Sequence, residues 1–193
     1  MDDLEYTRRL VGHQRAWWKR ALDVQAPYRW NLLRLQPGFT LEIGCGIGRN
    51  LAHLGIQGVG IERSRHSVAI ARQRGLQAFL PQEFAESPFN AAGRFDSLLF
   101  AHVFEHMTPP EAAQLLRAHA SLLKAGGRVL AFTPQEKGFL SDATHVTFMD
   151  FAALRAVLRE AGFAPVSEYS FPFPRALGRF FVYNEFVSVS RRT

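Results

Sequence analysis

Short strand-like runs alternate along the chain with segments whose apolar residues recur every three or four positions. The strand-like runs are 40–43, 58–61, 77–80, 95–101 and 128–133, with two more near 165–170 and 182–190. The segments with helical spacing are 49–54, 64–74, 109–123 and 150–161. Because strands and helices of these lengths alternate, the pattern predicts a parallel α/β sheet with right-handed crossovers and helices on both faces.

Residues that favour helix ends stand at the edges of these segments. Ser64 and Asp150 are suitable N-caps, and Pro109 suits the first turn of a helix. Gly75 and Gly162 stand just past two helix ends. The ligand of such a sheet lies beyond the carboxyl ends of its strands.

The first part of the chain has a different character. Residues 6–35 have helical spacing that Pro27 interrupts, and 8–20 is the densest basic segment, with Trp17 and Trp18 among its arginines. We expect a helical lid over 1–35, followed by the main domain over 36–193. The aromatic residues expected to line the substrate are Tyr6, Trp17, Trp18, Tyr28 and Trp30, together with the loop 171–181. A basic, aromatic face could also bind RNA, and this alternative stays open.

Composition narrows the class of protein. The chain has 193 residues, 47% of them hydrophobic, and a net charge of +6 carried mostly by scattered arginines. No apolar run approaches the roughly 18 residues that span a bilayer. The acidic start lacks the apolar core of a secretory signal, and Cys45 is the only cysteine, so we expect a cytoplasmic protein without disulfides.

The stretch TLEIGCGIGRNLAHLG, residues 40–55, carries the main chemical signal. It places Glu42 before glycines at 44, 46 and 48, where a strand becomes a helix. A dinucleotide fingerprint needs a later third glycine, where Arg49 stands, and a Walker loop needs a lysine that is missing. A nicotinamide oxidoreductase is therefore disfavoured. An acid at this turn suits a cationic or hydroxyl-bearing ligand.

This E-x-G-x-G-x-G order resembles motif I of the class I S-adenosylmethionine-dependent methyltransferases. The segments FDSLLFAHVFEHM, LLKAGGRVLAFTP and HVTFMDFAALRAVLREAGF resemble later motifs of that family in the same order. The resemblance implies a Rossmann-like, doubly wound, mostly parallel seven-stranded sheet with an antiparallel last strand. It also implies S-adenosyl-L-methionine as the cofactor and S-adenosyl-L-homocysteine as the product.

The family's cofactor residues carry over to matching positions. Glu62 would accept hydrogen bonds from both ribose hydroxyls, and Glu83 would lie near the adenine amine. The backbone at Ala101 and His102 would border the methionine. The full set of expected cofactor-binding positions is Glu42, Gly44, Cys45, Gly46, Gly48, Glu62, Arg63, Glu83, Phe84, Ala101 and His102. Arg63 stands where many members have an apolar residue, and the Cys45 side chain is expected to be a buried filler.

The expected reaction transfers the methyl group to an oxygen, nitrogen or carbon of a small molecule. His145 is the first candidate for a general base and His102 the second, while His106 is expected to hold the loop. We expect no metal ion. The adenine-type signature [DN]-P-P-[YF] is absent. An RNA or protein methyltransferase and a non-catalytic binding module are the alternatives; the acceptor and the oligomeric state do not follow from the sequence.

Overall fold

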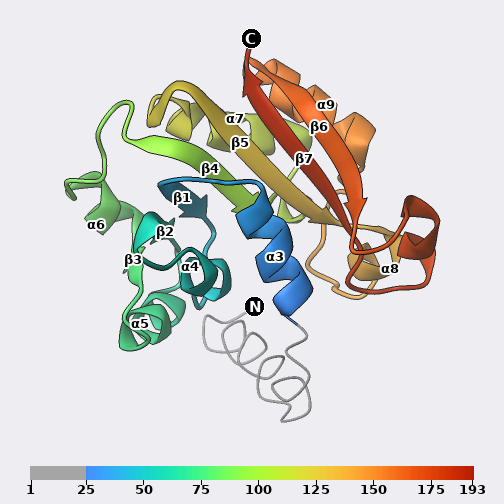
Figure 1. Ribbon diagram of the computed structural model, residues 1–193, viewed down its shortest axis with the longest axis horizontal. Helices are drawn as coiled ribbons and strands as arrows, with labels where there is room; N and C mark the ends of the chain where they lie inside the picture. Colours follow the sequence, from blue (N-terminus) through green and yellow to red (C-terminus); the bar gives the residue numbers. More distant parts are fainter. Residues whose placement is uncertain (1–24) are drawn as a thin grey trace. The chain divides into compact units, whose positions relative to one another are not determined.

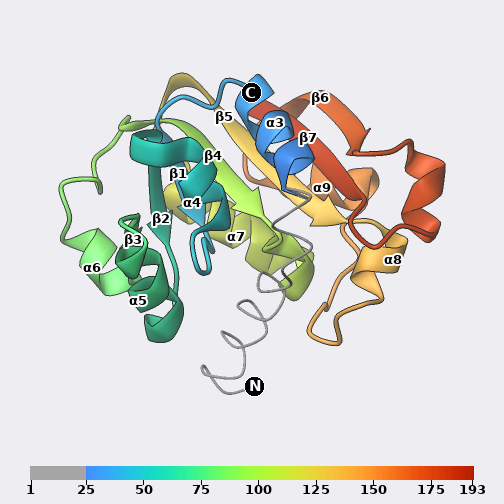
Figure 2. The same ribbon diagram turned by 60° about the horizontal axis from the view of Figure 1, so that its bottom comes forward.

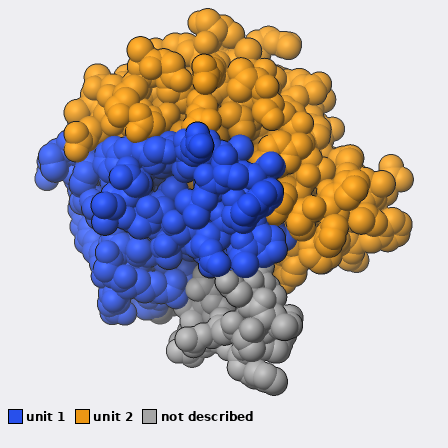
Figure 3. All heavy atoms as spheres, in the orientation of Figure 1, with its two compact units in different colours: residues 1–90 blue, residues 91–193 orange. Residues whose placement is uncertain are grey.

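The computed structural model describes residues 25–193, which divide into two compact units (Figure 3). The first unit ends at Asn90 and the second runs from Ala91 to Thr193. The expectations that concern residues 1–24 lie outside the described residues. They include most of the predicted lid, the basic segment, and the aromatic residues Tyr6, Trp17 and Trp18.

The first unit is built on a short parallel sheet of β3, β2 and β1. Its elements are α3 (Ala26–Arg34), β1 (Thr40–Ile43), α4 (Arg49–Leu54), η1 (Gly55–Gln57), β2 (Gly58–Ile61), α5 (Arg65–Gln73), β3 (Gln77–Phe79) and α6 (Pro81–Ala85). Both β1 and β2 are buried along their whole length. Helices α5 and α6 lie beside β3 (Figure 2). Strands β1 and β2 each run into a helix, as the sequence pattern predicts, and β3 is followed by the short helix α6.

The second unit is built on the four strands β4, β5, β7 and β6. Its elements are β4 (Phe95–Ala101), η2 (Phe104–His106), α7 (Pro109–Ala120), β5 (Leu123–Pro134), α8 (Glu136–Phe139), α9 (Phe151–Glu160), β6 (Phe163–Phe171), η3 (Arg175–Arg179) and β7 (Glu185–Arg192). Strand β7 runs antiparallel to both of its neighbours, β5 and β6 (Figure 1). The core of the unit includes Leu98, Leu99 and Phe100 of β4, all fully buried.

The strand order is β3-β2-β1-β4-β5-β7-β6, with β7, the last strand, antiparallel. The predicted Rossmann-like α/β class is therefore confirmed. The predicted caps are also in place: the Ser64 hydroxyl accepts a hydrogen bond from the Ser67 N–H at 3.1 Å, and the Asp150 carboxylate accepts one from the Ala153 N–H at 2.9 Å. These caps satisfy backbone donors that a helix leaves without partners at its start.

Three details differ from the sequence pattern. Strand β5 begins at Leu123 rather than 128, because pairing with Phe95 extends it through the AGG segment. Helices α6 and α8 are not among the segments for which the sequence pattern predicts a helix. Short helices of this kind have too few apolar positions for a period to be recognised.

Candidate functional site

The glycine-rich turn between β1 and α4 requires glycine for a conformational reason. Gly44, Gly46 and Gly48 have φ of 76°, 54° and 81°, in the left-handed region. A side chain there costs about 1–2 kcal/mol per residue. The turn therefore needs glycine at alternate positions. Where glycine stands, no side chain keeps a ligand away from the backbone.

Glu62 follows β2 and contacts this turn directly. Its side chain is buried, with Oε2 accepting a hydrogen bond from the Gly46 N–H at 3.0 Å and Oε1 accepting one from the Ser64 N–H at 2.8 Å. An ionised carboxylate has about four lone-pair sites, so each oxygen keeps capacity for another donor. The structure thus brings together two of the predicted cofactor residues, while the neighbouring Arg63 is exposed.

Glu42 is also buried at the same turn. Its Oε1 accepts a hydrogen bond from Asn50 Nδ2 at 2.6 Å. The Arg74 guanidinium donates to the carbonyl of Ile47 at 3.0 Å, which ties the far side of the turn to α5. The sequence analysis did not identify Asn50. Its place on α4, one residue after Arg49, is a signal that could have found it, because an amide at a helix start can reach back to the preceding turn.

Cys45 is a packing residue. A Cβ on Gly60 of β2 would stand 2.5 Å from its Sγ, so the thiol fills the space that this glycine leaves. Burial, together with the charges of Glu42 and Glu62, raises the pKa of the Cys45 thiol far above its usual range. Its N–H is already donated to the Ile61 carbonyl at 3.1 Å. The expected filler role fits this geometry.

Glu83 and Phe84, expected near the adenine, have other partners. The Glu83 carboxylate pairs with the Arg72 guanidinium and accepts the Leu80 N–H at 2.9 Å, which holds the start of α6. These bonds hold the pKa of Glu83 below its usual range. Phe84 is buried with its ring 6.4 Å from that of Phe79. Their contact with adenine stays a prediction, and a structural role accounts for both residues.

In the second unit, His102 follows Ala101 at the end of β4 and bridges two acids. Its φ is 58°, its Nδ1 lies 3.1 Å from Glu105 Oε1, and its Nε2 lies 2.8 Å from Glu185 Oε1. Burial lowers the pKa of His102, but the hydrogen bonds and charges of the two carboxylates outweigh it and raise the pKa to about 10. A protonated imidazole has no lone pair, so this geometry argues against His102 as a base.

His145 lies in the loop between α8 and α9, and its ring is held on two sides. Its Nδ1 donates to the Phe139 carbonyl at 2.7 Å, and its ring stacks on Phe139 at 22°. Since a carbonyl only accepts, Nδ1 carries the proton and Nε2 keeps its lone pair. The His106 ring lies 4.9 Å away, with Nδ1 3.2 Å from the Thr144 carbonyl. His106 thus holds the loop, as expected.

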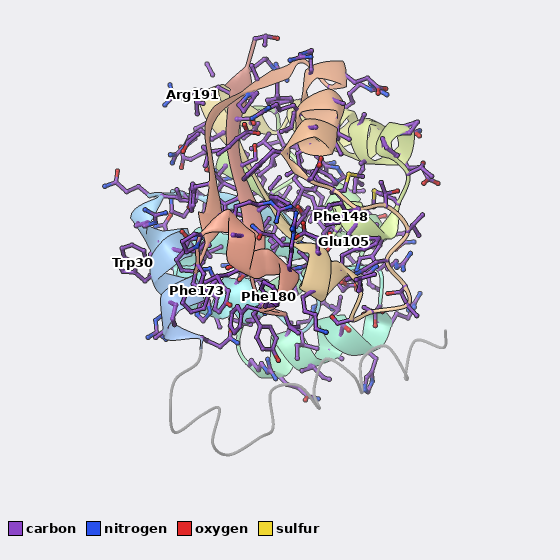
Figure 4. All side chains as sticks on the ribbon, turned by 90° about the vertical axis from the view of Figure 1, so that its right-hand side faces the viewer. Trp30, Glu105, Phe148, Phe173, Phe180 and Arg191 are labelled. Carbon is purple, nitrogen blue, oxygen red and sulfur yellow. The ribbon has the colours of Figure 1, made fainter. Side chains whose placement is uncertain are left out.

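Aromatic side chains gather on the connection between β6 and β7. Phe173 and Phe180, both labelled in Figure 4, are 43% and 76% exposed. Phe181 packs between Phe173 and Tyr183. This loop presents the aromatic surface expected of 171–181, while its part in a substrate wall stays a prediction. Trp30, on α3 in the first unit, is 58% exposed.

Residues 13–168 match the sequence profile of a family described as a methyltransferase domain. The chain belongs to this family. The match covers more than half of the chain and includes the glycine-rich turn, Glu62, His102 and His145. The match confirms the expectation, drawn from the sequence motifs, of a class I S-adenosylmethionine-dependent methyltransferase. In residues 25–193, no helix of the methyltransferase is long and apolar enough to cross a membrane.

Curated relatives of this methyltransferase include ubiquinone biosynthesis O-methyltransferases of several bacteria. A ubiquinone biosynthesis O-methyltransferase of Xanthomonas axonopodis pv. citri is 31% identical over 134 residues, covering 61% of this chain and 55% of that protein. One from Cereibacter sphaeroides is 35% identical over 118 residues, covering 58% and 45%. The chain therefore spans about half the length of the curated relatives it matches.

Solved structures share the fold of the methyltransferase. A possible histamine N-methyltransferase of Thermotoga maritima has a TM-score of 0.71 at 21% identity, covering 97% of this chain and 98% of that one. The magnesium protoporphyrin IX methyltransferase of Synechocystis, solved with bound S-adenosylmethionine, has a TM-score of 0.60 at 17% identity, covering 100% and 98%. Together with the family match, these structures confirm S-adenosylmethionine as the cofactor of the class.

Proposed function

We propose that the chain transfers the methyl group of S-adenosylmethionine to a small-molecule acceptor, with a hydroxyl oxygen as the first candidate. The observation that carries the proposal is the contact between Gly46 and the buried Glu62 at the turn after β1. It places a carboxylate able to accept from a vicinal diol beside a glycine of the turn, which has no side chain. The curated relatives named O-methyltransferases support oxygen as the acceptor atom.

The reaction is an in-line displacement. An acceptor lone pair forms a bond to the methyl carbon while the bond from that carbon to the sulfonium sulfur breaks, and the electron pair of that bond stays on sulfur. The products are the methylated acceptor and S-adenosylhomocysteine. The sulfonium charge already activates the methyl group, so the main work of the protein is positioning and exclusion of water.

A hydroxyl acceptor must lose its proton. We propose that His145 accepts it, because Nε2 has a lone pair that the Phe139 carbonyl keeps in place through Nδ1–H. Removing a positioned base typically slows a reaction about 10²- to 10⁴-fold. His145→Ala should therefore lower kcat for a phenolic acceptor much more than it lowers affinity for S-adenosylhomocysteine.

The proposal is tested first at the cofactor. Isothermal titration calorimetry would measure S-adenosylhomocysteine binding to the wild type, to Glu62→Gln, and to Glu86→Gln as a matched control, since Glu86 is exposed on the same unit. A hydrogen bond to a charged group is worth about 1.5–3 kcal/mol, so Glu62→Gln should weaken binding by roughly 10- to 150-fold. Circular dichroism would establish that both variants are folded.

Two results would count against this function. Equal affinity in all three proteins would remove Glu62 from the cofactor site. Binding without any S-adenosylhomocysteine formed from a panel of phenols, amines and carbon acids would favour the non-catalytic binding module. The RNA alternative depends on the segment 8–20, which lies outside the described residues; RNA affinity that fell steeply with salt would support it.

A further inference from the structure

Three side chains of the second unit converge from two segments far apart in the sequence. Glu105 and His106 belong to η2, and His145 belongs to the loop before α9. Ligand-capable atoms of the three residues all lie within 4.8 Å of one another. Figure 4 labels Glu105 inside the unit. The sequence analysis expected no metal ion; His145 follows His106 by 39 positions (145 − 106), so the sequence does not place them together.

Only one of the two oxygens of the Glu105 carboxylate has a hydrogen-bond partner in the part of the chain that the structure describes. The residue is fully buried, and its Oε1 is taken by His102 Nδ1 at 3.1 Å. Its Oε2 has no hydrogen-bond partner among the described residues. Leaving a buried polar atom without a partner costs about 1–3 kcal/mol, and more when the group is charged. Such an oxygen calls for a cation or donor that residues 25–193 do not supply.

The two imidazole rings are oriented as metal ligands usually are. Each points its Nδ1 at a backbone carbonyl, His106 at that of Thr144 and His145 at that of Phe139. The carbonyls fix the proton on Nδ1 and leave the lone pair on Nε2. Metal-binding histidines almost always donate their other N–H in this way, which sets the tautomer and the ring direction.

Backbone hydrogen bonds hold the two segments together. The N–H groups of Val146 and Thr147 both donate to the Glu105 carbonyl, at 2.7 and 3.1 Å. The Asp142 carboxylate accepts from the N–H and the hydroxyl of Thr144, which fixes the turn before His145. The main chain therefore contributes to the relative placement of the two segments, beside the contact of the His106 ring with Thr144.

We propose that Glu105 Oε2 and the Nε2 atoms of His106 and His145 bind one divalent transition-metal ion. Two imidazoles and one carboxylate suit Zn²⁺ and its neighbours in the first row, whereas Mg²⁺ and Ca²⁺ prefer oxygen ligands. Ligand atoms about 2.1 Å from a tetrahedral ion lie about 3.4 Å apart. The ligand atoms here lie within 4.8 Å of one another, so they would have to move closer together when the ion binds, and three protein ligands leave an open position.

The proposed metal site and the proposed methyl transfer share one atom. The Nε2 lone pair of His145 either binds the ion or accepts a proton from the acceptor. Metal binding therefore decides whether His145 is available as a base. Loss of the metal site would leave the base role in place, so the two proposals fail separately.

The test is direct metal binding to the full chain without an affinity tag. Zn²⁺ would be titrated by calorimetry after treatment with a chelator, and Co²⁺ binding would be followed by its visible absorption, whose intensity reports the coordination geometry. We expect one ion per chain, with Mg²⁺ binding far more weakly. Removing a group that only hydrogen-bonds to a metal ligand lowers metal affinity about 10- to 100-fold. His106→Ala and His145→Ala remove a ligand itself, so each should lower the affinity by at least this factor.

A matched control separates this site from chance binding to surface histidines. His66 is exposed on α5 in the first unit, and His66→Ala should leave the affinity unchanged. His106 is exposed, and circular dichroism would establish that His106→Ala is folded; Glu105→Gln should also abolish binding. No binding of Zn²⁺ at millimolar concentration would overturn the proposal. Binding that is equally strong in His106→Ala and His145→Ala would overturn it as well.

Discussion

The bridge between His102 and Glu185 should be a strong ion pair because it is buried. Unit charges 2.8 Å apart interact by roughly 6 kcal/mol at an effective dielectric constant of about 20, before the cost of desolvation. The Glu185 side chain is 8% exposed and that of His102 is 33% exposed, so water weakens the pair only partly. We expect a coupling free energy of about 2 kcal/mol, toward the upper end of the range for contacting residues.

A double-mutant cycle measures this coupling. The variants are His102→Asn, Glu185→Gln and the double substitution; asparagine tolerates the left-handed φ of 58° at this position. Breaking a buried pair from one side costs about 3–5 kcal/mol, and the partial exposure of His102 places His102→Asn near the lower value. Urea unfolding at pH 7 with a chelator present would give the free energy of unfolding of each protein.

The control is an ion pair of nearly the same length at the surface. Lys124 Nζ lies 2.7 Å from Asp96 Oδ1, but both side chains are more than 40% exposed. Exposed pairs contribute about 0.2–1 kcal/mol. The cycle of Lys124→Gln and Asp96→Asn should thus give a much smaller coupling. Equal couplings in the two cycles would refute the reasoning that burial, rather than distance, makes the His102 bridge strong.

Two further predictions concern the turn after β1. Cys45 should not react with iodoacetamide at pH 8 in the folded protein and should react in urea, because burial raises its pKa; rapid labelling of the folded protein would contradict the packing. Gly60→Ala should lower the free energy of unfolding by about 1–3 kcal/mol, since the new Cβ would stand 2.7 Å from Cys45 Cβ and from Leu51 Cδ1. An unchanged midpoint in urea would mean that the turn can move aside.

Local signals in the sequence predicted the alternation of strands and helices well. The caps Ser64 and Asp150 are recognisable because a cap acts on the backbone two or three residues away. The left-handed glycines of the turn are recognisable for a similar reason: the constraint belongs to the residue itself. The class of fold and the glycine-rich turn after β1 could therefore be predicted.

Contacts between distant segments could not be predicted in the same way. The ion pair of Glu83 with Arg72 depends on how α5 and α6 pack. The charge state of His102 depends on Glu185, 83 residues later in the chain. The cluster of His106 and His145 likewise requires the backbone hydrogen bonds to Glu105. Side-chain types alone do not reveal which of these partners meet.

The two hydrogen bonds that hold Glu62 have a consequence for affinity. A free glutamate side chain loses about 1.5–2 kcal/mol of conformational entropy when it is fixed in one rotamer. Because the N–H groups of Gly46 and Ser64 already anchor both carboxylate oxygens, that loss occurs when the chain folds. The carboxylate is thus preorganised. Binding of a nucleoside to it would not have to offset this entropy loss, so more of the favourable contact free energy would appear in the affinity.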